Sequence, residues 1–155
     1  WDPLCQTFTV ERQRGSDYLL ISSVEIYFQA KDATRGVAVE LREVDQETGY
    51  PTTLSIPYSR VYKRPADINI SATAATSTKF TFNSPLVLKA GVEYAIVISP
   101  DANSPDYRVW TSEPGVPDVT DTSLISNQSW GLGTLFTSTS NRANSPFRCF
   151  TKSIP

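Results

Sequence analysis

Two runs of alternating apolar and polar residues meet at Gly91, and this pattern restricts the chain to β structure more than any other feature. Period-2 geometry places every second residue of a strand on the same face. A glycine can adopt the positive φ that a tight reversal needs, so residues 85–98 predict a β-hairpin. The two runs place the following residues on shared apolar faces: Leu86 with Leu88, and Tyr94 with Ile96 and Ile98. These faces need cover, which predicts a second sheet packed on the first.

The same alternation recurs along the chain and predicts further strands. In residues 37–42, Ala38, Glu40 and Arg42 take the outward parity, which predicts a strand with a charged outer face. Residues 56–61 are interrupted by Pro57 and predict an edge strand or a connection. Other strands are expected within residues 4–10, 18–29, 68–71, 80–82, 107–112, 132–136 and 147–151. The sequence therefore predicts an all-β fold: a two-layer antiparallel β-sandwich, jelly-roll or Greek-key-like, with about nine or ten strands.

Length and charge suggest one domain without a nucleic-acid partner. The 155 residues fit a single β-sandwich domain over 1–155, and the absence of Met leads us to expect a fragment of a longer chain. The 14 basic and 16 acidic residues are scattered and give a formal charge of −2, which argues against nucleic-acid binding. Because every apolar run is shorter than a membrane span, no membrane insertion is expected.

The chain offers few groups for catalysis. It contains no His, which removes the usual general base and the commonest metal ligand. Glu40 could form a carboxylate pair with Glu25 or Glu43, as in glycosidases, but the parity of Glu25 and Glu40 predicts solvated outward charges. We therefore expect no catalytic residues and no enzyme activity.

Cysteines and loop carboxylates leave two structural questions open. Cys5 and Cys149 could form a disulfide that closes a very long loop, or could be two small buried thiols. Two pairs of aspartates could supply oxygen ligands to a structural calcium ion, although their spacing does not match the regular calcium loop and favours ordinary turn carboxylates. These pairs are Asp101 with Asp106 and Asp118 with Asp121. No other cofactor is expected.

Three aromatic residues are the candidate ligand-binding residues. Tyr107 and Trp110 border the polar loop after Pro100, and Trp130 follows another polar stretch. An exposed ring can stack on the apolar face of a sugar while nearby polar groups bond its hydroxyls. The alternative, which average burial of large aromatics favours, is that these rings serve packing.

A set of short sequence segments, in a fixed order along nearly the full chain, resembles a known protein family. They include Asp2-Pro3-Leu4-Cys5-Gln6-Thr7-Phe8-Thr9-Val10, Ser23-Val24-Glu25-Ile26-Tyr27-Phe28, Gly49-Tyr50-Pro51, Phe82-Asn83-Ser84-Pro85, Gly91-Val92-Glu93-Tyr94-Ala95, Tyr107-Arg108-Val109-Trp110 and Gly133-Thr134-Leu135-Phe136. Together they resemble a β-sandwich module of virion structural proteins, from the tail, baseplate or fibre region of contractile-tailed, T4-like or marine bacteriophages. Cys5 departs from the pattern, in which a small Ala is more usual.

The resemblance implies a non-catalytic structural or interaction module in the virion, which docks subunits or presents an adhesin. Its partners would be other virion subunits or copies of itself. The alternative is an extracellular or cell-surface carbohydrate-binding module that recognises a host or polysaccharide glycan through Tyr107, Trp110 and Trp130.

Overall fold

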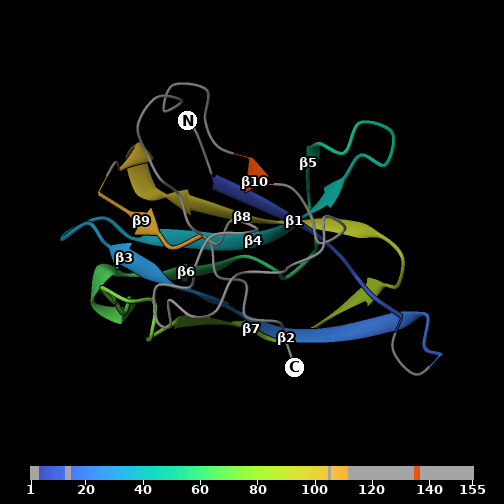
Figure 1. Ribbon diagram of the computed structural model, residues 1–155, viewed down its shortest axis with the longest axis horizontal. Coiled ribbons are helices and arrows are strands. Elements are labelled where there is room, and N and C mark those ends of the chain that lie inside the picture. The colour runs from blue at the N-terminus through green and yellow to red at the C-terminus, as the bar shows by residue number, and fades with distance from the viewer. Residues whose placement is uncertain (1–3, 13–14, 105, 112–134, 137–155) are drawn as a thin grey trace, which may run out of the picture.

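The computed structural model describes residues 4–12, 15–104, 106–111 and 135–136, and within them the chain forms a two-layer antiparallel β-sandwich (Figure 1). The predicted fold class is therefore confirmed. A single domain over 1–155 includes residues outside these ranges and stays a prediction. No helix in the described part of the chain has the length and apolar character needed to cross a membrane.

The larger layer has the strand order β10-β1-β8-β4-β5, and β6 also pairs with β4. Its strands are β1 (Leu4–Thr9), β4 (Val37–Val44), β5 (Pro51–Ser55), β6 (Val61–Lys63), β8 (Glu93–Pro100) and β10 (Leu135–Phe136). The central strand β8 pairs with β1 on one side and β4 on the other. Its neighbours therefore come from distant parts of the sequence, as is typical of Greek-key connections.

The second layer consists of two two-stranded sheets. β2 (Tyr18–Ile26) pairs with β7 (Thr78–Lys89), and β3 (Phe28–Ala30) pairs with β9 (Arg108–Val109). In Figure 1 β2 and β7 run along the lower side of the view, with β1, β4 and β8 above them. Short 3-10 helices at Pro65–Asp67 and Asp101–Asn103 complete the described elements.

The core fills the space between these layers. It is built from inward residues of both, because alternation gives each strand one apolar face. Its fully buried large side chains include Phe28, Phe80, Leu41 and Leu88. The Phe28 and Phe80 rings lie 6.3 Å apart between centroids. Burying side chains of this size contributes roughly 1.5–3 kcal/mol each relative to leaving them exposed.

The predicted hairpin at Gly91 is wrong, although its turn is present. Gly91 has φ of 78°, but β7 pairs with β2 while β8 pairs with β1 and β4, so the turn carries the chain from one layer to the other. The backbone N–H of Gly91 donates to Val10 C=O at 2.7 Å, and that of Ala90 donates to Asp17 C=O at 2.8 Å. The two apolar faces therefore cover each other: Leu88 and Tyr94 are both buried in the same core.

The predicted charged outer face of β4 is also wrong. Ala38 and Glu40 are 1 % and 5 % exposed, although they alternate with the core residues Val39 and Leu41. The opposite face of the larger sheet carries a second buried cluster, made of Cys5, Val44, Ala95 and Val97. β4 is thus buried on both faces. The alternation of apolar and polar residues within a single strand does not show that its second face is also covered.

Several strand boundaries differ from the sequence-based ranges. The expected strand over 18–29 divides into β2 and β3, which pair with different partners, and the strand near 107–112 is limited to Arg108–Val109. The edge strand expected at 56–61 lies earlier, at Pro51–Ser55, where it occupies the end of the larger sheet. The strand expected at 147–151 lies outside the described residues.

Candidate functional site

Tyr107, the first predicted ligand-binding residue, is half-buried, and both its ring and its hydroxyl contact the rest of the protein. Its hydroxyl donates to Arg35 C=O at 2.7 Å, and its ring packs edge-on against Phe28 with centroids 5.9 Å apart. Burial, with a smaller contribution from the Asp32 carboxylate, raises the pKa of Tyr107 to about 12. The phenol therefore stays neutral and acts as a hydrogen-bond donor within the fold.

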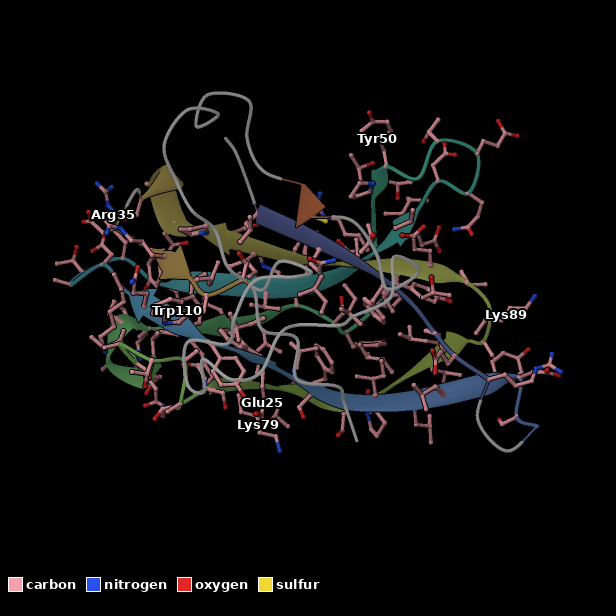
Figure 2. The ribbon with its side chains drawn as sticks, viewed as in Figure 1. Glu25, Arg35, Tyr50, Lys79, Lys89 and Trp110 are labelled. Carbon is pink, nitrogen blue, oxygen red and sulfur yellow. The ribbon has the colours of Figure 1, made fainter. Side chains whose placement is uncertain are left out.

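Trp110 is held in a similar way. Its indole Nε1–H donates to Ser71 C=O at 2.7 Å, and its backbone N–H donates to Tyr27 C=O at 2.8 Å. The single donor of the indole is thus used inside the protein. Figure 2 places Trp110 at the β3 and β9 end of the sandwich. Trp130, the third predicted residue, lies outside the described residues, so the structure does not bring the three together.

A polar clasp beside Tyr107 joins the loop before β4 to the loop after β8. Asp32 accepts hydrogen bonds from Ser104 Oγ at 2.6 Å, from the backbone N–H groups of Thr34 and Arg35 at 2.7 and 3.0 Å, and from Thr34 Oγ1 at 3.1 Å. These donors, Ser104 first, hold the pKa of Asp32 well below its usual range. The carboxylate is therefore an ionised structural anchor with its acceptor sites occupied.

Of the predicted calcium ligands, Asp101 and Asp106 lie within the described residues. Asp101 accepts a hydrogen bond from Tyr62 Oη at 2.7 Å, which raises the pKa of Tyr62. In the described ranges, no group of three or more His, Cys, Asp or Glu side chains is placed to hold a metal ion. Asp118 and Asp121 lie outside these ranges.

Glu25 and Glu40 belong to different layers and do not form a carboxylate pair. Each alternates with core residues of its own strand, so the two carboxylates lie on opposite outer faces of the sandwich. Glu25 is exposed and accepts a hydrogen bond from Ser77 Oγ at 2.8 Å. In the strand register it lies opposite Lys79 of β7 (Figure 2). Glu40, expected to be solvated, instead lies 2.5 Å from Arg42 Nη2 and 3.5 Å from Arg60 Nη1.

Cys5 lies on β1 and its side chain is buried. Burial raises its pKa to about 12, against a smaller lowering by Arg42, so the nucleophilic thiolate is disfavoured. Cys149 lies outside the described residues, and the pairing of Cys5 with Cys149 stays a prediction.

A different surface, at the β5 edge of the larger sheet, carries the two most exposed tyrosines of the described residues, Tyr50 and Tyr58. A tight turn begins it: Asp45 accepts from the backbone N–H groups of Glu47 and Thr48 at 2.9 and 3.1 Å, and Gly49 has φ of 72°. Pro51 then starts β5, whose bridges to β4 are Val44 with Pro51 and Arg42 with Ser55, with an irregularity between them. This arm stands away from the body at the upper right of Figure 1.

The turn after β5 holds Tyr58 in an unfavourable backbone conformation. Tyr58 has φ of 65°, which costs an L-residue other than Gly roughly 1–2 kcal/mol. The neighbouring Ser59 is fully buried and bonds both backbone groups of Leu41, which anchors the turn to β4. The ring of Tyr58 consequently faces solvent and is 77 % exposed.

Three large side chains are exposed along this arm, and we call them the edge patch: Tyr50 at 62 %, Leu54 at 60 % and Tyr58 at 77 %. Figure 2 shows Tyr50 pointing outward from the arm. Pro57 predicted an edge strand or a connection here, but these three residues were not predicted as a binding site. The sequence signal that could have identified them is their spacing of four residues around an uncharged strand that lies between two prolines.

A second exposed apolar group lies on the outer face of the second layer. Leu20 and Val87 are direct cross-strand neighbours, and Tyr18 pairs with Lys89 beside them. These side chains are regularly paired within a sheet whose backbone is unstrained, unlike the turn at Tyr58. The edge patch is therefore the stronger candidate for binding. Comparison of the chain with protein-family models, with curated proteins and with solved structures finds no match.

Proposed function

We propose that the chain is a non-catalytic structural and interaction module that docks neighbouring subunits through the edge patch. The observation that carries this proposal is the exposure of Tyr50, Leu54 and Tyr58 along one sheet edge. Tyrosine is favoured at protein interfaces because its ring buries a large area while its hydroxyl can still bond. The positive φ of Tyr58 adds support, since backbone strain tends to be kept where it serves binding.

The assembly that we propose for this module is a phage tail or baseplate. This part of the proposal depends on the ordered phrases that resemble virion structural proteins. Location in the virion, and partnership with other virion subunits or further copies of the chain, follow from that assignment. In a symmetric particle, repeated copies would turn modest single contacts into firm attachment through effective concentration.

Carbohydrate binding through Tyr107, Trp110 and Trp130 is the alternative function. The geometry favours it less, because Tyr107 Oη and Trp110 Nε1 already donate to carbonyl groups of the chain. A glycan array tests it: binding that disappears in Trp110→Phe or Trp130→Ala, with unchanged folding, would replace the docking proposal.

The docking proposal is tested in the virions that carry the parent protein. Immunogold electron microscopy with antibodies to this chain should label the tail or baseplate, and its absence from purified virions would overturn the assignment. The variant Leu54→Ser with Tyr58→Ser should reduce incorporation into particles while the isolated chain remains folded. The matched control is Leu20→Ser with Val87→Ser, which removes exposed apolar side chains from the other layer. Equal incorporation of the edge variant and the wild type would contradict docking through the edge patch.

A further inference from the structure

Strand β5 ends the larger sheet. Among the described strands, β4 is its neighbour on one side and none pairs with it on the other. Natural edge strands are commonly blocked by inward charges, Lys or interior Pro, because their free backbone groups can pair with another strand. β5 is five residues long, begins with Pro51 and pairs irregularly with β4, but its remaining residues, Thr52-Thr53-Leu54-Ser55, have no charge and no Pro. This edge is therefore suited to adding a strand.

The charges flanking β5 have opposite signs at its two ends. Glu43, Asp45 and Glu47 lie exposed at the end where β5 begins, and Arg60 follows the turn where it ends. The Arg60 side chain is 57 % exposed and has one long contact, 3.5 Å, with Glu40. A guanidinium carries five N–H donors, so Arg60 can bind a second carboxylate. An antiparallel partner with the same sequence would place its acidic turn beside Arg60.

We propose that two copies of this chain pair through β5, antiparallel and around a two-fold axis at Thr53, to form one sheet that continues across both molecules. In this register Thr53 lies opposite itself, Leu54 lies opposite Thr52, and Ile56 lies opposite Tyr50. Each acidic turn reaches the Arg60 end of the other copy. Two-fold symmetry makes both charge contacts form at once, because the same patch serves on each side.

The edge patch would gain apolar contact in the same arrangement. Leu54 lies one residue from the axis, so the two copies of Leu54 are close to each other on the shared sheet. Tyr50 and Tyr58 flank the paired segment and can cover its ends. This inference rests on the proposed function, because it names a second copy of the chain as the partner of the edge patch.

Sedimentation equilibrium of the full chain over a wide concentration range measures the pairing. We expect a reversible monomer–dimer equilibrium that Leu54→Lys weakens by about tenfold or more, because a charge at a sheet edge opposes pairing. The matched control Leu20→Lys changes an equally exposed leucine on the other layer and should leave the dimer intact. A monomer at every concentration, or a dimer that only Leu20→Lys disrupts, would overturn the proposal.

Charge reversal tests the orientation. Glu47→Arg alone and Arg60→Glu alone should each raise the dimer dissociation constant by about 2- to 30-fold, the range expected for two exposed ion pairs. The double variant Glu47→Arg with Arg60→Glu should restore most of the affinity, because both pairs re-form with reversed signs. If the loss of dimerisation free energy in the double variant equals the sum of the losses in the two single variants, the antiparallel register is wrong.

Cross-linking tests the axis. Cross-strand neighbours have Cα atoms about 4.5–5.5 Å apart, within the range for a disulfide. Thr53→Cys in a Cys149→Ser background should therefore form a disulfide-linked dimer under mild oxidation, whereas Leu20→Cys in the same background should not. Failure of the pairing is distinguishable from failure of the proposed function. A monomeric chain whose edge variant is lost from virions refutes only the pairing, and a dimeric chain that is absent from virions refutes only the assembly.

Discussion

The hydroxyl of Ser59 binds both backbone polar groups of Leu41: its Oγ accepts from the Leu41 N–H at 3.1 Å and donates to the Leu41 C=O at 3.2 Å. Both residues are fully buried. Ser59 lies two residues before β6, and β5 ends four residues before it. Between them the backbone N–H of Ile56 also donates to the Leu41 C=O at 2.8 Å. The Ser59 side chain thus supplies the acceptor for the Leu41 N–H at the point where the edge changes from β5 to β6.

Ser59→Ala should lower the free energy of unfolding by about 1–3 kcal/mol, because it leaves the buried Leu41 N–H unpaired while the Leu41 C=O keeps the Ile56 N–H as its donor. Urea unfolding followed by tryptophan fluorescence measures the change. Ser22→Ala, at an exposed position of β2, is the control and should stay within about 0.5 kcal/mol of wild type. An effect of Ser59→Ala as small as that of the control would mean that Leu41 finds other partners.

Asp32 should make stability depend on pH in the acid range. Its folded pKa lies below the ordinary value of 3.8, so the ionised form stabilises the fold above about pH 5. This contribution decreases as the pH falls below about 4 and is lost as it passes through the folded pKa. Urea midpoints of wild type and Asp32→Asn should therefore differ most at neutral pH and converge toward pH 2. A constant difference across this range would show that the charge of Asp32 is not what stabilises the clasp.

Gly36→Ala should destabilise the same end of the sandwich. A Cβ at this position would overlap Tyr62 Oη and Cζ and lie 2.6 Å from the Lys63 carbonyl oxygen. Overpacking of this kind typically costs about 1–3 kcal/mol. In a double-mutant cycle, Gly36→Ala with Tyr62→Ala should cost less than the sum of the single changes, since one of the two obstacles is removed. Simple additivity would contradict this close approach.

Cys5 should react slowly in the folded protein. With a pKa near 12 and little exposure, its thiol is protonated and shielded at pH 8. Iodoacetamide labelling under reducing conditions, read by peptide mass spectrometry, should leave Cys5 unmodified in buffer and modify it in urea. Rapid labelling of the native protein would contradict the burial of β1.

Local patterns predicted most of the strands but not their partners. The strand expected at 68–71 is wrong, because Ile70 forms only an isolated bridge with Phe28. The parity of Leu86, Leu88 and Tyr94 identified the residues that face the core, and the positive φ of Gly91 was foreseen. The same turn residues suit a hairpin or a crossing between layers. The choice between them depends on contacts with Val10 and Asp17, which are distant in the sequence.

The candidate site was harder to predict for a related reason. Tyr107 and Trp110 have the residue types of a sugar-binding surface, yet their polar atoms are used by the carbonyls of Arg35 and Ser71. Glu40 has outward parity but lies on a strand that is covered on both faces. Exposure of a side chain depends on what packs over it, and alternation along one strand carries no information about that cover.

The crossing at Gly91 also sets the order in which the chain can fold during synthesis. β1 and β4 both need β8, so most of the larger sheet must wait until Glu93–Pro100 has left the ribosome. Until then β1 and β4 lack their central partner, and their unpaired backbone groups and apolar side chains can aggregate. Chaperone binding would protect the nascent chain in this state.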